Sequence, residues 1–206
     1  MIEMIGVLAV IAILAAMLIP RVFQAVDTAR VTSTMVALET IKTAAIDHYG
    51  RQGRLDMKLG TPLTLTGGFY YGYDTNVLLP EGLLEKPFTS RLAGQKGGTD
   101  TSDPTLNVVV QLATGPNANG SAGYDLDGSA GTDRTKVATA TAQYVLEAVI
   151  NNCSLADAKE LNDRIDGLAL GAPAATPNGP DTKGKVEYTV NTTDNTCTVY
   201  VYLTHR

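Results

Sequence analysis

The sequence predicts an α+β fold in which a long N-terminal helix packs, along its second half, on an antiparallel β-sheet. Three features of the 206-residue chain lead to this expectation: an uncharged apolar start, an amphipathic continuation, and alternating apolar segments near the C-terminus. We therefore divide the chain into an N-terminal helix over residues 1–50 and a globular head over residues 51–206. The net charge of −5 gives no sign of a nucleic-acid-binding surface, because such domains usually carry an excess of basic residues.

Residues 1–20 have the composition of a membrane-spanning helix. Residues 4–19 are all uncharged, and a helix over residues 1–19 would be ~28 Å long, close to the hydrocarbon thickness of a bilayer. A secretory signal peptide would begin with a basic region, whereas this chain carries Glu3 there. A buried helix of a soluble core would be apolar on one stripe rather than all round. We expect this segment to lie in lipid or against other such helices.

The helix is expected to continue beyond Pro20 as an amphipathic segment over residues 21–50. Apolar residues recur there at steps of three and four and mark one face of the helix: Val31, Met35, Leu38, Ile41 and Ala45. Gly50 and Gly53 are suited to ending a helix. Because Pro20 lacks a backbone N–H, it should weaken the helix near the junction of the two halves.

The head is predicted to begin with loops and short strands. Residues 69–73 and 106–113 have strand composition, and residues 78–88 indicate a short helix that ends at Pro87. Residues 115–133 are rich in Gly, Asn, Ser and Asp and should form an exposed loop.

Two further helices are predicted in the second half of the head. Residues 135–150 have apolar residues at helical steps, which favours a helix over a strand. Residues 154–167 predict a helix more clearly, because Ser154 is a good N-cap and Asp157 follows three residues later in a capping-box position.

The chain ends in a predicted β-hairpin. Residues 185–190 and 197–204 both alternate in polarity and are joined by a short polar turn. The alternation of the last strand places four apolar side chains on one face, namely Cys197, Val199, Val201 and Leu203.

The only two cysteines, Cys153 and Cys197, lie 44 positions apart and form no CxxC pair. With His48 and His205 they have no spacing typical of a zinc site. They favour a single disulfide over two buried thiols if this part of the chain lies outside the cytoplasm. His48 is expected to be a partly exposed helix residue. No catalytic motif stands out, so we expect a protein that is not an enzyme.

The start of the chain resembles the N-terminus of type IV pilins and of the related type II secretion pseudopilins. Mature members of this family begin, in outline, with Phe-Thr-Leu-Ile-Glu, followed by an apolar run with a Pro near its end. Here Ile2 and Glu3 match the Ile-Glu pair, residues 4–19 match the run, and Pro20 matches the Pro. The family's basic leader, cleavage-site Gly and N-methylated Phe would precede Met1, so processing by a prepilin peptidase is an expectation from the resemblance.

The resemblance implies the major structural subunit of an extracellular type IV pilus-like filament. Its partners would be identical subunits and the pilus assembly machinery, and the subunit would wait in the cytoplasmic (inner) membrane before assembly. Glu3 would pair with the N-terminal amine of a neighbouring subunit and set the register, and Pro20 would let the helix melt locally. Small residues would permit close packing in the filament core: Gly6, Ala9, Ala12, Ala15 and Ala16. The head would end in a disulfide-closed region.

Several alternatives stay open. Within the family, the chain could be a type II secretion pseudopilin or a minor pilin. From another class, it could be a membrane-anchored enzyme or binding domain, although residues 51–206 offer no recognisable catalytic chemistry. Glu3 could instead be an acidic residue solvated by lipid headgroups, and Pro20 a simple kink.

A calcium site is a weaker candidate in the same family, because some pseudopilins bind calcium through loop carboxylates. Asp125, Asp127 and Asp133 lie near a Gly turn, although their spacing is not that of an EF-hand. Gly-Asp sequences of this kind are more often plain turns. We therefore expect no cofactor, with calcium as the alternative.

Overall fold

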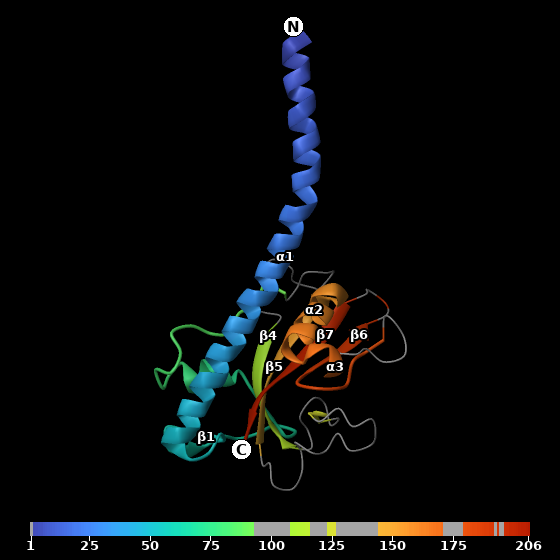
Figure 1. Cartoon of the computed structure of the whole chain (residues 1–206). Coiled ribbons are helices and arrows are strands. Elements are labelled where there is room, and N and C mark those ends of the chain that lie inside the picture. The colour runs from blue at the N-terminus through green and yellow to red at the C-terminus, as the bar shows by residue number, and fades with distance from the viewer. Residues whose placement is uncertain are drawn as a thin grey trace.

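A single helix, α1 (Ile2–Gln52), runs from the N-terminus into a β-sheet head, and its first half projects away from the head (Figure 1). This computed structural model describes residues 2–92, 108–115, 123–126, 144–170, 179–191, 193 and 196–206. A long helix followed by an antiparallel sheet confirms the predicted α+β class.

The head is built on a five-stranded antiparallel sheet with strand order β3-β4-β5-β7-β6. A separate two-stranded hairpin pairs β1 with β2. In chain order the head elements are β1 (Met57–Lys58), β2 (Thr61–Pro62), β3 (Phe69–Tyr71), the π-helical turn η1 (Asp74–Leu78), β4 (Val108–Thr114), β5 (Tyr144–Ser154), α2 (Leu155–Ile165), α3 (Gly167–Leu170), β6 (Val186–Asn191) and β7 (Thr196–His205).

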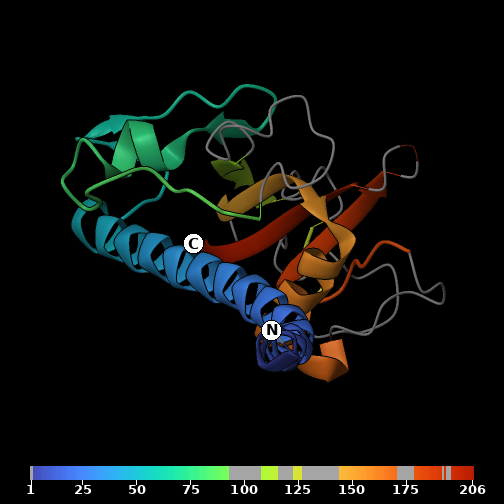
Figure 2. The same ribbon diagram turned by 90° about the horizontal axis from the view of Figure 1, so that it is seen from above.

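The second half of α1 lies along the head, as the view from above shows (Figure 2). The predicted apolar stripe is the face that packs: Val31, Leu38, Ile41 and Ala45 are buried, and Met35 packs partly buried against the same core. The helix continues through Gly50 and ends at Gln52. Gly53, the second glycine predicted to end it, adopts φ of +72°, and its N–H donates to the carbonyl of Tyr49 at 2.7 Å. The amphipathic pattern therefore predicted the packed face correctly.

The central strand β5 is buried on both faces. One face of the sheet meets α1 and α2 through apolar side chains of the central strands, among them Leu112, Ile150 and Val199. On the other face the ring of Tyr124 is fully buried beside Ala113 and Val145. Residues 123–126 form neither helix nor strand, as predicted for the loop over residues 115–133, but the predicted exposure is wrong there, because Gly123, Tyr124 and Asp125 are buried.

The helix predicted for residues 135–150 is also wrong from Tyr144 onward, where the chain forms β5 in the middle of the sheet. A central strand covered on both faces need not alternate, so its run of apolar residues can match helical steps by chance. The polar side chain of Glu147 lies inside this run and is itself buried. Residues 135–143 lie outside the described part of the chain.

The short helix predicted for residues 78–88 is replaced by the π-helical turn η1, which ends at Leu78, and by turns and irregular chain after it. The carboxylate of Asp74 accepts the backbone N–H of Phe88 at 2.8 Å and holds the end of this segment. Gly82 lies within the segment and adopts φ of +70°, which interrupts a helical path.

The predicted helix of residues 154–167 and the C-terminal hairpin are confirmed. Ser154 caps α2 by accepting the N–H of Asp157. In β7 the predicted apolar face is buried, as Cys197, Val199, Val201 and Leu203 show. After α2, the Asp166 carboxylate accepts the backbone N–H groups of Lys185 and Val186 and so positions the start of β6.

Gly184 should be essential to this last connection. It adopts φ of +85°, and a Cβ there would lie 2.4 Å from an oxygen of Asp166. We predict that Gly184→Ala lowers the free energy of unfolding by roughly 3 kcal/mol, since it adds backbone strain and displaces a carboxylate that holds two N–H groups. Gly82→Ala is the matched control, with positive φ but open space, and should cost about 1 kcal/mol. Urea unfolding of the full chain in detergent measures both, and equal losses would contradict the prediction.

Candidate functional site

The projecting half of α1 is the most unusual surface of the molecule. Every residue from 4 to 29 is exposed, including the large apolar side chains. Leu14, for example, is 62 % exposed. By length and composition this helix could cross a membrane, and its apolar stretch is not buried in the head. Soluble monomers rarely expose so continuous an apolar surface, so this half of the helix requires cover by lipid or by other protein.

The small residues proposed for close packing all lie on this projecting half. Gly6, Ala9, Ala12, Ala15 and Ala16 are exposed, and a side chain added at Gly6 would meet nothing within 4 Å. These positions are open to an approaching helix. Their role in a filament core stays a prediction.

The two other residues singled out from the sequence lie in the same helix. Pro20 is inside α1, which continues unbroken through it. Glu3 belongs to the first turn of α1, and its side chain lies outside the described residues. The register role of Glu3 and the helix-weakening role of Pro20 therefore remain predictions.

The second half of α1 is anchored to the head by polar contacts as well as by its apolar face. Thr34 and Ser90 share a buried hydrogen bond of 3.1 Å between their hydroxyl oxygens. Arg164 of α2 donates to the hydroxyl of Thr32 at 2.9 Å. These contacts tie the helix to two separate parts of the head, at Ser90 and at α2.

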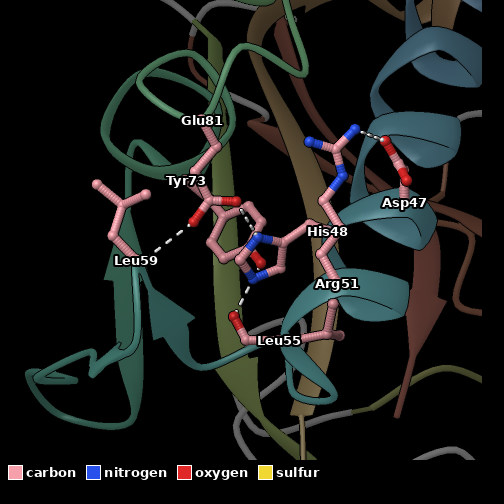
Figure 3. A network of polar contacts seen from close by, with 7 residues as sticks. All are labelled: Asp47, His48, Arg51, Leu55, Leu59, Tyr73 and Glu81. Carbon is pink, nitrogen blue, oxygen red and sulfur yellow. Dashed lines mark hydrogen bonds and ion pairs between the residues drawn. The ribbon is translucent and has the colours of Figure 1, made fainter.

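His48 forms a buried polar contact close to the end of the helix (Figure 3). Its Nδ1 lies 2.7 Å from Oε2 of Glu81, and both side chains are almost completely buried. Because a carboxylate only accepts, Nδ1 carries the hydrogen of this bond. The other oxygen of Glu81 accepts the backbone N–H of Leu59, so one carboxylate joins α1 to the turn between β1 and β2.

The ring of His48 also packs edge-on against Tyr73, with ring centroids 5.8 Å apart. Tyr73 is buried and donates its hydroxyl to the carbonyl of Leu55 at 2.8 Å. The prediction of a partly exposed His48 is therefore wrong. Its partner Glu81 lies 33 residues away, so the spacing along the helix held no sign of the pair.

The two cysteines are brought together as directly opposed residues of β5 and β7. Both are buried. Burial raises the pKa of the Cys153 thiol, with a further contribution from the charge of Asp157, so this thiol is a poor nucleophile until it is exposed. Opposed residues of antiparallel strands lie within the Cα separation that a disulfide requires. The predicted disulfide is thus compatible with the strand register and remains a prediction.

The calcium candidates are only partly placed. Asp125 is buried, whereas Asp127 and Asp133 lie outside the described residues. Among the residues that the structure describes, no group of three or more His, Cys, Asp or Glu side chains gathers as a metal site would. The calcium site remains a prediction.

The side of the sheet away from α1 holds a polar group that sequence reasoning missed. The carboxylate of Glu147 is fully buried and accepts from Gln111 Nε2 and from the hydroxyl of Tyr124, each at 2.6 Å. Burial and the neighbouring charge of Glu147 raise the pKa of Tyr124 well above its ordinary value. The hydroxyl therefore stays protonated and continues to donate, which makes this group an internal support of the head.

No protein-family model matches the chain, and comparisons with curated proteins and with solved structures found no significant match. Its function must therefore be inferred from its own residues and geometry.

Removing His48 from its buried hydrogen bond with Glu81 should cost far more than removing one partner of an ion pair on the surface. His48→Ala leaves the buried Glu81 carboxylate without its partner, and we expect a loss of about 3–5 kcal/mol in the free energy of unfolding. The matched control is Arg51→Ala, because Arg51 pairs with Asp47 at the same 2.7 Å but on the exposed side of the helix. That loss should stay below about 1 kcal/mol. Urea unfolding of the full chain in detergent gives both values, and a small effect of His48→Ala would show that the pair contributes little.

Mild oxidation should join Cys153 to Cys197. The expected product has no titratable thiol after denaturation, and in the chain-entropy model the bond adds ~4 kcal/mol to the free energy of unfolding, which reductant removes. Thiol titration in denaturant and urea unfolding with and without reductant measure these two effects. Cys197→Ser, which cannot form the bond, serves as the control. Two reactive thiols persisting after oxidation of the unmodified chain would exclude the disulfide.

Proposed function

We propose that this chain is the major structural subunit of an extracellular type IV pilus-like filament and that it polymerises through the first half of α1. The observation that carries the proposal is that residues 4–19 of α1 are uncharged and exposed, project from the head and belong to the same unbroken helix that packs on it. A membrane anchor alone would explain the apolar composition. The resemblance at Ile2, Glu3 and Pro20 adds the features that favour assembly.

The physical basis of assembly is the cost of exposing apolar surface. Each large apolar side chain of the projecting half gains about 1.5–3 kcal/mol when it is moved from water into an apolar environment. Lipid provides that environment before assembly, and the same segment of other copies provides it afterwards. Copies that meet through two different surfaces do not close into a ring unless the rotation between them allows it, so they extend into a helical fibre.

Glu3 would set the position of each subunit along that fibre. A carboxylate held at membrane depth costs at least ~2.5 kcal/mol on insertion scales, which favours pairing with an opposite charge. The partner implied by the resemblance is the N-terminal amine of a neighbouring subunit. A buried ion pair of this kind is better suited to fixing register than to adding stability.

The head would form the outer surface of the fibre. Its attachment to α1 through the buried stripe and the His48–Glu81 pair keeps the projecting half in a fixed direction relative to the head. A type II secretion pseudopilin or a minor pilin would share this geometry and is distinguished by whether the chain makes up most of a surface filament.

Replacing Glu3 should separate membrane insertion from assembly. Glu3→Ala should leave the chain in the membrane and reduce the yield of sheared filaments at least tenfold, because the charge that sets the register is lost. Electron microscopy and immunoblotting of the sheared and membrane fractions measure this effect. Asp27→Ala removes an exposed acid from the same helix beyond the apolar run and should assemble normally. Normal filaments from Glu3→Ala would contradict the role of Glu3, and unmodified chain that forms no filament would contradict the proposed function.

A further inference from the structure

A small cavity lies where α1, α2 and the strands β6 and β7 come together in the head (Figure 2). Its volume is about 230 Å³, which is below the range of about 300–1,000 Å³ found for sites of drug-sized ligands. Leu38 of α1 and Val201 and Leu203 of β7 line it, and each is at most 4 % exposed. The cavity therefore has apolar walls and room for a small molecule.

Basic residues are concentrated in the lining of this cavity. Of the ten described residues that line it, three are basic, namely Lys42 of α1, Arg164 of α2 and Lys185 just before β6. In the whole chain, by contrast, Lys and Arg make up 16 of 206 residues. The same ten residues include one acid, Glu39, so three positive charges face one negative charge. The lining thus has a net charge of +2 in a chain whose net charge is −5.

Arg164 is held in place by the protein and retains further donors. It donates to the hydroxyl of Thr32 at 2.9 Å and to the carboxylate of Glu160 at 2.6 Å. A guanidinium has five N–H donors, so these two bonds leave three for an anion. Arg164 also lies in the last turn of α2, where a positive charge favours the helix dipole. Its presence alone is therefore explained by the fold.

The two lysines have no such explanation within the head. Nζ of Lys42 lies 3.7 Å from Oε1 of Glu39, which is longer than the 2.7–2.9 Å or so of a charge-assisted hydrogen bond. In the part of the chain that the structure describes, the ammonium of Lys185 forms no ion pair. Its nearby acid Asp166 already accepts the backbone N–H groups of Lys185 and Val186. Two ammonium groups therefore border the cavity without a hydrogen-bonded carboxylate among the described residues.

We infer that this cavity binds a small phosphate monoester, with the phosphate at the three basic residues and the organic part against the apolar walls. At neutral pH a phosphate monoester carries a charge near −2, which matches the +2 of the lining, whereas a carboxylate would balance only half of it. Phosphate oxygens accept hydrogen bonds and suit both the planar guanidinium and the flexible ammonium groups. The site belongs to the head and does not depend on the proposed filament.

A phosphate monoester could come from solution or from a lipid headgroup such as that of phosphatidic acid. The α1 residues of the cavity begin at Met35, sixteen positions beyond Ile19, at which the apolar run ends. This separation is ~24 Å along the helix, whereas each headgroup layer is only roughly 5–8 Å thick. We therefore expect the ligand to be a soluble ester.

Binding of phenyl phosphate to the full chain in an uncharged detergent tests the site. Isothermal titration calorimetry should show saturable binding of one molecule per chain, weakened by added salt. Phenol, which lacks the phosphate, and inorganic phosphate, which lacks the apolar part, should both bind more weakly. Absence of saturable binding at millimolar phenyl phosphate, or equal binding of phenol, would overturn the inference.

Variants assign the binding to this cavity. Lys185→Gln and Lys42→Gln should each weaken phenyl phosphate binding about tenfold, because each removes a charged donor. Glu39→Gln should strengthen it, because it removes the one acid of the described lining. Lys183→Gln is the matched control, since it removes the same charge two residues away from Lys185 and Lys183 does not line the cavity. Its affinity should stay within about twofold of the unmodified chain.

Equal effects of Lys185→Gln and Lys183→Gln would show a diffuse charge effect and overturn the site. Unchanged midpoints of urea unfolding would show that the variants stay folded. For the source of the phosphate, the chain is placed in phosphatidylcholine vesicles that contain phosphatidic acid or, as a control for surface charge, the diester phosphatidylglycerol. Equal phenyl phosphate affinity in both supports a soluble ligand. Loss of binding with phosphatidic acid alone would overturn it in favour of the lipid headgroup.

Discussion

The burial of one face of α1 against the sheet is the interaction on which the rest of the structure depends. Val31, Leu38 and Ala45 pack into the same core as the central strands and so fix how the second half of the helix lies on the head. Because α1 continues without a break through Pro20, this packing also sets where the projecting half leaves the head. The burial of one stripe of α1 thus determines which apolar surface of the helix is covered by the head and which stays exposed.

Polar pairs strengthen this attachment where they are removed from water. His48 and Glu81 pair inside the head, and the second oxygen of Glu81 holds the turn between β1 and β2. Arg51 and Asp47 lie on the solvent side of the same part of the helix and have the same separation of 2.7 Å. We expect this pair to contribute far less, since water competes for both charges. Position relative to the core, more than distance, therefore decides which of these pairs anchors the helix.

The local periodicity of the sequence predicted much of this fold, whereas contacts between segments far apart in the sequence could not be predicted from it. The stripe of α1, the Ser154 cap and the C-terminal hairpin each depend on neighbouring residues, and all were predicted correctly. The strand β5 was missed because burial on both faces removes the alternation of polar and apolar residues. The partners that allow Glu147 to be buried lie on β4 and at Tyr124, far from it in the sequence. His48 was missed for the same reason: a fully buried imidazole requires a partner that the helix sequence does not contain.

The apolar run and the charged residue before it would solve different parts of the assembly problem. Apolar attraction is non-directional, so two uncharged helices that slide along each other by one heptad, about 10 Å, keep nearly the same contact energy. Apolar packing of residues 4–19 can therefore hold copies together, but it distinguishes poorly between neighbouring registers. A single charge pair at the end of the helix removes this degeneracy, because every shifted register leaves a carboxylate without its partner in an apolar environment. In this proposal the uncharged run requires Glu3, since no other residue of the first nineteen carries a charge.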